Sequence, residues 1–154
     1  MKHVKRSVLL WYSAHEMYAL VTAIQDYPKF LPWCDRAEVI ERHEDGVTAR
    51  LHLAFAGVRQ AFTTRNVEIM DSSVEMTLVD GPFSALHGTW RFTPVRAPGE
   101  DSAAATQACR IDFELAYHFS SRALAVLISP VFDRIADTFV DAFVQRAQAV
   151  YGAR

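Results

Sequence analysis

The feature that most constrains the fold is a long amphipathic segment near the C-terminal end. Between Ser121 and Tyr151, apolar residues recur near helical spacing, and polar residues fall largely on the other side. The apolar stripe comprises Leu124, Leu127, Ile128, Val131, Ile135, Phe139, Phe143 and Val150. An unbroken helix over this range would be about 45 Å long, whereas a compact domain of this size has a radius of gyration of about 15 Å. A sheet that faces this helix along its length must therefore curl around it.

Two other signals concern helix ends. Ser13 and Glu16 have the spacing of a capping box, which predicts that a helix begins here. We expect it to end at Tyr27-Pro28, because the residue before a proline avoids helical geometry. In the C-terminal segment, Pro130 is expected to kink the helix or to divide it into a short and a long piece.

The chain between these helices alternates between apolar and polar residues, as β-strands do. The inward-facing residues of the predicted strands include Val47, Ala49, Leu51, Leu53 and Phe55; Val74, Met76 and Leu78; Leu86, Gly88, Trp90 and Phe92; and Ile111, Phe113, Leu115, Tyr117 and Phe119. Within residues 60–70, Phe62 indicates one parity and Val67 and Ile69 the other, so a bulge is expected. A polar loop is expected over residues 94–106.

These elements predict a single α+β domain over residues 1–154, in which an initial strand and two helical segments precede a meander of six antiparallel strands and the long helix. The inward faces carry many bulky aromatic residues, namely Phe55, Phe62, Trp90, Phe92, Phe113, Tyr117 and Phe139. Their spacing leaves open whether they fill a core, which is the commoner case, or line a cavity.

Several classes of function receive no support from the sequence. A net charge of -2 and a pI of about 6.3 disfavour a general nucleic-acid binder, so DNA is not an expected partner. We find no nucleophile elbow, phosphate loop, dinucleotide motif or zinc-ligand spacing, and therefore predict neither catalytic nor metal-binding residues. The apolar stretch Val8–Tyr12 is too short for a signal peptide, so Cys34 and Cys109 are expected to be reduced thiols in the cytoplasm.

Five segments together resemble one family. They are Tyr27-Pro28-Lys29-Phe30-Leu31-Pro32-Trp33-Cys34, Phe62-Thr63-Thr64-Arg65-Asn66, Leu78-Val79-Asp80-Gly81-Pro82-Phe83, Leu86-His87-Gly88-Thr89-Trp90-Arg91-Phe92 and Val150-Tyr151-Gly152. Their order, from nearly one end of the chain to the other, resembles the ubiquinone-binding START-like proteins of the polyketide cyclase/dehydrase superfamily. Bacterial members of this family include ribosome-association toxins.

The resemblance implies a helix-grip fold, with a curved antiparallel sheet around the long helix and a cavity between them. It implies that the cavity binds ubiquinone or a similar isoprenoid lipid, so that the protein acts without catalysis as a quinone chaperone for respiration. A pocket for such a ligand would measure about 300–1,000 Å³. The expected ligand contacts are Phe30, Trp33, Leu53, Phe55, Phe62, Phe83, Trp90, Phe92, Phe113, Leu115, Tyr117, Val131, Ile135 and Phe139.

The Pro-rich segment from Tyr27 to Trp33 has two open interpretations. It is either a lid, with Phe30 and Trp33 at the mouth of the cavity and in contact with a membrane surface, or a rigid loop whose aromatic side chains plug the core. The lid would allow peripheral contact with the inner membrane face. We expect Trp33 to lie beside a cavity if the segment is a lid.

Two other functions remain as alternatives. The first is a toxin that binds the 50S ribosomal subunit and inhibits translation, with steep salt dependence if it contacts phosphates. The basic surface for this role would consist of Lys2, Lys5, Arg6, Arg50, Arg65 and Arg91. The second is a cyclase or dehydratase, which needs an acid or base inside the pocket, and the inward faces offer almost none.

Overall fold

Seven strands and three helical segments make up the computed structural model, which describes residues 1–96 and 107–154. The strands are β1 (Lys2–Leu10), β2 (Cys34–His43), β3 (Gly46–Phe55), β4 (Val58–Ile69), β5 (Ser73–Asp80), β6 (Phe83–Pro94) and β7 (Cys109–Phe119). The helices are α1 (Ala14–Thr22), the 3₁₀ helix η1 (Ile24–Lys29) and α2 (Arg122–Tyr151). Most of the loop predicted over residues 94–106 lies outside the described residues.

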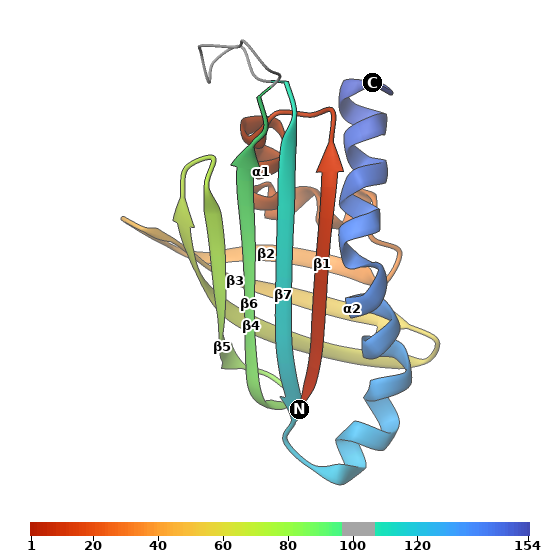
Figure 1. Cartoon of the computed structure of the whole chain (residues 1–154). Coiled ribbons are helices and arrows are strands. Elements are labelled where there is room, and N and C mark those ends of the chain that lie inside the picture. The colour runs from red at the N-terminus through yellow and green to blue at the C-terminus, as the bar shows by residue number, and fades with distance from the viewer. Residues whose placement is uncertain (97–106) are drawn as a thin grey trace.

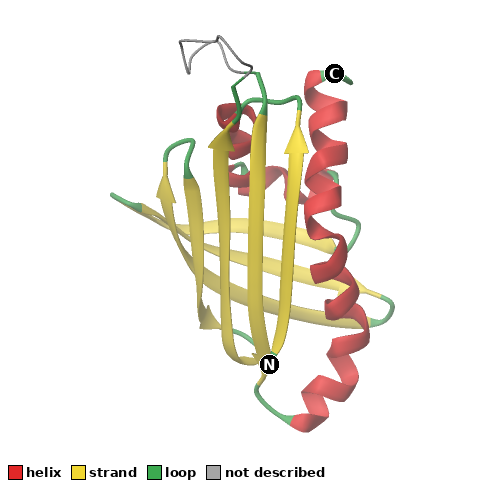
Figure 2. Cartoon of the chain, viewed as in Figure 1, coloured by secondary structure: helices red, strands yellow, loops and turns green. Residues whose placement is uncertain are grey.

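All neighbouring strands pair antiparallel in one sheet, in the order β1-β7-β6-β5-β4-β3-β2. Figure 1 shows β2, β3 and β4 running across the direction of β1, β7 and β6, so the sheet is strongly curled. Helix α2 runs along the open side of this curl, while α1 and η1 connect the two edge strands (Figures 1 and 2). The predicted α+β architecture, a curved antiparallel sheet with a long C-terminal helix, is confirmed.

The capping box forms as predicted. The Ser13 hydroxyl accepts a hydrogen bond from the Glu16 amide at 3.0 Å, and the Ser13 amide donates to the Glu16 carboxylate at 2.9 Å. The predicted end of this helix is wrong, because α1 ends at Thr22 and the chain continues as η1. Pro28 lies inside η1, where the chain folds back so that the Tyr27 hydroxyl donates to the Val21 carbonyl.

Helix α2 is continuous across Pro130, so the predicted division into two pieces does not occur. Figure 1 shows that its first turns are inclined to the rest of the helix, as expected of a proline kink. None of the helices in the described part of the chain combines the length and the apolar character needed to cross a membrane.

The buried stripe of α2 differs in part from the prediction. Ile128, Ile135 and Phe143 are buried, whereas Leu127 is 58% exposed and Val150 is also exposed. Val131, Phe139 and Leu124 are half-buried. The stripe is completed by Phe132, Ala136, Val140 and Ala147. Apolar residues lie on both sides of the helix near Pro130, and small alanines carry little hydrophobic signal, so the sequence pattern misplaced the stripe.

Strand β4 keeps one parity along its length. It pairs with β3 without a register shift, so Phe62, Thr64 and Asn66 face inward while Val67 and Ile69 face outward. A register shift occurs only towards β5, where Thr63 and Thr64 pair with Asp80 and Leu78. The extra residue of this irregularity is Val79 in β5, so the bulge expected within residues 60–70 is not found and β4 keeps its parity. Apolar residues were misleading here because two of the inward positions, Thr64 and Asn66, are polar.

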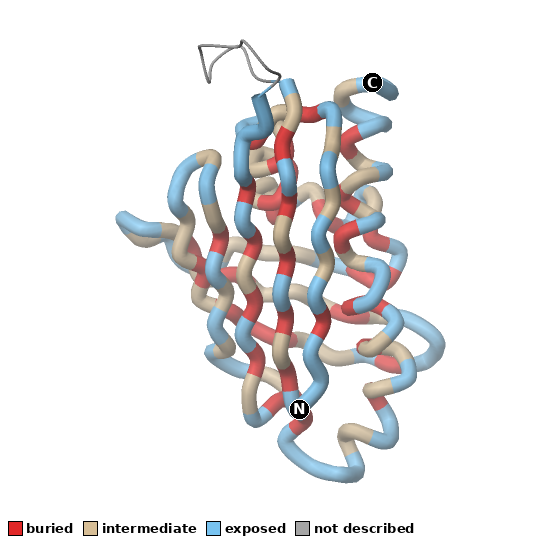
Figure 3. Tube along the Cα trace, in the orientation of Figure 1, coloured by how far each residue is buried: buried red, intermediate tan, exposed pale blue. Residues whose placement is uncertain are grey.

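Alternation in β6 and β7 agrees with the prediction, and Figure 3 shows buried residues recurring along both strands. Phe55 departs from it, since this side chain is 41% exposed. Phe55 is the last residue of β3, next to the turn at Ala56-Gly57.

Candidate functional site

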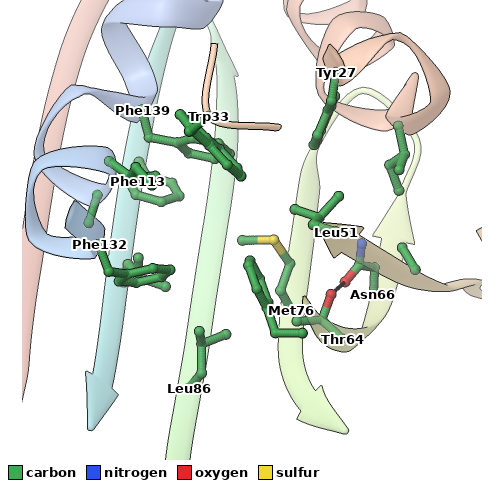
Figure 4. A pocket seen from close by; sticks show the side chains of 16 residues that line it. Tyr27, Trp33, Leu51, Thr64, Asn66, Met76, Leu86, Phe113, Phe132 and Phe139 are labelled. Atoms are coloured by element: carbon green, nitrogen blue, oxygen red, sulfur yellow. Dashed lines mark hydrogen bonds between the residues drawn. The ribbon is translucent and has the colours of Figure 1, made fainter. Parts of the chain in front are cut away.

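A largely apolar pocket lies between α2 and the concave face of the sheet (Figure 4). Its walls come from η1, from the connection before β2, from strands β3 to β7 and from α2. The lining residues are Ile24, Tyr27, Trp33, Ala49, Leu51, Phe62, Thr64, Asn66, Met76, Leu86, Phe113, Leu115, Phe132, Ile135, Ala136 and Phe139. The cavity measures about 60 Å³. It is smaller than the predicted 300–1,000 Å³, so a ring-sized ligand requires side chains to move.

One side of the pocket is aromatic. The ring centroids of Phe139 and Phe113 lie 5.7 Å apart, and Phe139 also contacts Trp33 at 6.2 Å. Phe132 packs edge-on against Phe62 with centroids 6.0 Å apart. Edge-to-face and tilted contacts of this kind stabilise the wall beyond the burial of its area.

The other side carries the polar groups. Thr64 and Asn66 are both buried on the inward face of β4, and the Thr64 hydroxyl donates to Asn66 Oδ1 at 2.7 Å. The Tyr27 hydroxyl is engaged with the Val21 carbonyl, and burial raises the pKa of this phenol above its ordinary value. Among the residues that the structure describes, the lining contains no carboxylate, imidazole, ammonium or guanidinium group. Such a wall suits a neutral ligand, because a buried charge without a partner is strongly unfavourable.

Six predicted contact residues line this pocket, namely Trp33, Phe62, Phe113, Leu115, Ile135 and Phe139. The structure places eight others outside it: Phe30, Leu53, Phe55, Phe83, Trp90, Phe92, Tyr117 and Val131. Most of these belong to the surrounding core. Trp90 is fully buried against Phe113 with ring centroids 4.6 Å apart, and Phe92 stacks on Trp90.

The aromatic residues nearer the start of α2 form a second packed layer. Phe83 and Tyr117 contact Phe132 with centroid distances of 5.0 and 4.7 Å. The Tyr117 hydroxyl donates to Asp133 at 2.5 Å, so this polar end points away from the apolar wall. Phe83 and Tyr117 thus pack against Phe132, which lines the pocket, without lining it themselves.

Phe30 lies apart from Trp33 in its contacts, although both belong to the same connection. Its ring packs against Phe143 at 5.1 Å and lies beneath the Arg146 guanidinium at 5.2 Å. Trp33, which is 7% exposed, lines the pocket. The expectation that both side chains lie at the mouth is therefore wrong for Phe30.

The lining residues outside the predicted set were missed for different reasons. Leu51, Met76 and Leu86 had the correct inward parity, but the prediction favoured aromatic residues. Thr64 and Asn66 were missed because only apolar positions were considered. The remaining members are Ile24, Tyr27, Ala49, Phe132 and Ala136.

Half of the predicted basic surface is paired with carboxylates. Lys5 pairs with Glu114 at 3.6 Å, and Arg6 pairs with Asp141 at 2.7 Å. Arg65 pairs with Asp45. Arg6 and Arg65 also lie on strands that are far apart in the sheet order. The six cations are distributed over β1, β3, β4 and β6.

No group of three or more histidine, cysteine and acidic side chains in residues 1–96 and 107–154 is arranged to hold a metal ion. Both cysteines are buried, and burial raises the pKa of each thiol to about 11. A thiol with such a pKa is a poor nucleophile at neutral pH.

The curled sheet, the long helix and the apolar pocket between them define the START-like class of proteins. A START superfamily protein from Mycobacterium smegmatis superposes with a TM-score of 0.76 at 15% identity, covering 96% of this chain and 98% of the other. An 18 kDa protein from Caulobacter crescentus superposes with a TM-score of 0.72 at 30% identity, covering 99% of this chain and 100% of the other. The chain thus has the helix-grip fold that the sequence resemblance implied.

Residues 10–144 match the family described as polyketide cyclase / dehydrase and lipid transport, so the chain belongs to this family. It is 41% identical to the ribosome association toxin RatA of Pseudomonas aeruginosa, covering 97% of this chain and 98% of that protein. The ribosome association toxin RatA of Escherichia coli is 39% identical, covering 100% of this chain and 92% of that protein. The mitochondrial coenzyme Q-binding protein COQ10 homolog B of Xenopus laevis is 30% identical, with 95% of this chain and 58% of that protein covered.

Proposed function

We propose that this protein associates with the ribosome and inhibits translation. The observation that carries the proposal is the similarity to proteins named ribosome association toxins, which extends over nearly the whole of both chains. This function belongs to the cytoplasm, in line with the location expected from the sequence. The 50S subunit is the proposed partner.

The ion pairs on the surface bear on how such binding would work. A phosphate contact by Lys5, Arg6 or Arg65 competes with a carboxylate that already holds the cation. These three cations then displace few counterions, so the binding constant should fall less steeply with salt than six unpaired cations would make it. We therefore propose binding through shape and neutral contacts more than through net charge.

A cell-free translation assay tests the inhibitory part of this proposal. Adding the purified protein should lower the synthesis of a reporter in proportion to the protein added. Protein that has been heat-unfolded serves as the control and should have no effect. Reporter synthesis that does not change at a protein concentration above that of the ribosomes would contradict the proposal.

A second candidate function is the binding of a neutral apolar lipid such as ubiquinone. The pocket supports it, because its wall is largely apolar and its described residues include no charged side chain. The similarity to a protein named as coenzyme Q-binding supports the quinone as the class of ligand. Transfer of isoprenoid carbons from water into such a wall stabilises the complex by about 0.8 kcal/mol per methylene. On this proposal the protein is a quinone chaperone for respiration, with membrane contact during loading.

Mass spectrometry of lipid extracted from the purified native protein tests the second function. We expect the native protein to retain a quinone. A Phe139→Leu variant should retain a smaller amount of it, because Phe139 lines the pocket. Val126→Ser is a suitable control, since Val126 lies on the same helix and is exposed. An extract without any quinone or isoprenoid lipid would contradict this function.

We further propose that neither function requires catalysis. Within the described part of the chain, the pocket lining offers Tyr27 as its one ordinary acid or base, and that hydroxyl already donates to a backbone carbonyl. Loss of this hydrogen bond would be needed before Tyr27 could transfer a proton to a ligand. Incubation of the protein with a poly-β-ketone substrate tests this point, and a cyclised product would contradict it.

A further inference from the structure

Two polar side chains interrupt the apolar wall of the pocket. Thr64 and Asn66 are 7% and 5% exposed, and both line the cavity. They are two residues apart on β4, so they project from the same face of the sheet. A wall that served only to fill the core would not need polar groups here, because a buried polar group must find a hydrogen-bond partner.

The hydrogen bond between them fixes the orientation of the Asn66 carboxamide. The Thr64 hydroxyl donates to Asn66 Oδ1 at 2.7 Å, as Figure 4 shows. The amide nitrogen Nδ2 is thereby directed away from Thr64. Within the described ranges, 1–96 and 107–154, no hydrogen bond from Nδ2 to a protein acceptor is formed. The Asn66 amide therefore has donor capacity that the surrounding protein does not use.

The position of this donor relative to the aromatic wall defines the shape of a ligand. Figure 4 shows Trp33, Phe113, Phe132 and Phe139 on one side and Thr64 and Asn66 on the other, with Met76 between them. Met76 is unbranched and flexible, so it can make way for a ring at modest cost. A flat ligand in the space that the Met76 side chain occupies would lie against the aromatic rings and present its edge to Asn66.

We propose that Asn66 Nδ2 donates a hydrogen bond to a carbonyl oxygen of a neutral, ring-sized ligand, and that Thr64 is a positioning residue that holds the carboxamide. The proposal deepens the second function, ligand binding in the pocket, and rests on it. A carboxylate or ammonium ligand is disfavoured, since the lining supplies no opposite charge. A ketone or a quinone fits both the apolar wall and the single donor.

The test compares two probes that differ only in their carbonyl groups. 2-Methyl-1,4-naphthoquinone has two ring carbonyls, and 2-methylnaphthalene has the same carbon skeleton without them. Isothermal titration calorimetry should show that the native protein binds the quinone more tightly by about 2–10-fold beyond any difference in their partition into an apolar solvent, as expected for one neutral hydrogen bond.

Variants assign this selectivity to the two side chains. Asn66→Leu should abolish it while 2-methylnaphthalene still binds, and Thr64→Val should reduce it because the carboxamide loses its anchor. Thr63→Val is the matched control, since Thr63 lies next to Thr64, is buried and faces the opposite side, where its hydroxyl accepts from Arg50. This control should keep the native selectivity. Thermal unfolding confirms that each variant is folded.

The failures are distinguishable. If both probes bind the native protein without selectivity, or if Asn66→Leu weakens both equally, the carbonyl subsite is wrong while ligand binding stands. In that case the Asn66 amide is satisfied by a buried water alone. If neither probe binds, the pocket is not a ligand site, and both the subsite and the second function are overturned.

Discussion

The indole ring of Trp33 and the phenyl ring of Phe139 lie against each other at one end of the pocket, with centroids 6.2 Å apart. This contact joins the connection before β2 to the long helix. The connection carries fewer ladder hydrogen bonds than the strands, so it is the part of the wall that moves at least cost. Separation of Trp33 from Phe139 is therefore our preferred route by which the small cavity opens.

Substitution of Trp33 tests this route. We expect Trp33→Leu to accelerate the binding of 2-methyl-1,4-naphthoquinone in stopped-flow fluorescence. A smaller side chain at this position would leave the contact with Phe139 partly open. Phe30→Leu is the control, since Phe30 belongs to the same connection but packs against Phe143 outside the pocket. Equal acceleration by both variants, or none with Trp33→Leu, would favour a rigid loop.

Gly88 provides a way to narrow the pocket. A methyl group added there would meet Met76 Cε at 2.7 Å and Leu115 Cδ1 at 3.2 Å, and both belong to the pocket lining. These atoms are ends of side chains, so Gly88→Ala should fold with a small change in Tm while its affinity for the naphthoquinone falls several-fold. Thr89→Ala, on the outward side of the same strand, should leave affinity unchanged. Unchanged affinity in Gly88→Ala would show that the ligand binds elsewhere.

Phe132 anchors the aromatic layer, although the sequence pattern selected its neighbour Val131. Its ring contacts Tyr117 at 4.7 Å and Phe83 at 5.0 Å and is buried. We expect Phe132→Ala to lower the free energy of unfolding in urea by about 3–5 kcal/mol, and Val131→Ala by roughly 1 kcal/mol or less, because Val131 is half-buried. The reverse order would mean that the predicted stripe was correct.

The difference between these two neighbours shows what sequence periodicity can and cannot predict. The alternation in β6 and β7 predicted their buried faces because their inward residues are nearly all large and apolar. The same criterion failed for β4, where the inward positions are Thr64 and Asn66. The fold followed from pattern and helix length, whereas the pocket wall depends on which core residues border empty space, and that property has no periodic signal.

The pairing of Glu16 with Arg154 makes stability depend on pH. Arg154 donates to both carboxylate oxygens of Glu16, at 2.6 and 2.8 Å, which holds the pKa of this carboxyl below its ordinary value. A carboxyl with a lowered folded-state pKa stabilises the fold above its unfolded pKa, and this contribution is lost as the pH falls through the folded value.

We therefore expect Glu16→Gln to lower Tm at neutral pH and to have a smaller effect at acidic pH, as the native carboxyl becomes protonated. Glutamine can still accept from the Ser13 amide, so the cap is retained. Glu44→Gln, at an exposed turn, should leave Tm unchanged at both pH values. A difference that persists in acid would assign the effect to the cap and not to the ion pair.

Association with the ribosome is the central claim, and sedimentation with purified 50S subunits tests it most directly. We predict that the protein moves with the 50S peak in a sucrose gradient, and that a triple replacement of Lys5, Arg6 and Arg65 by Gln weakens this only slightly, because each cation is already paired. The same weak dependence should appear when the salt concentration is raised. Protein that remains at the top of the gradient at low salt, with subunits in excess, would contradict the claim.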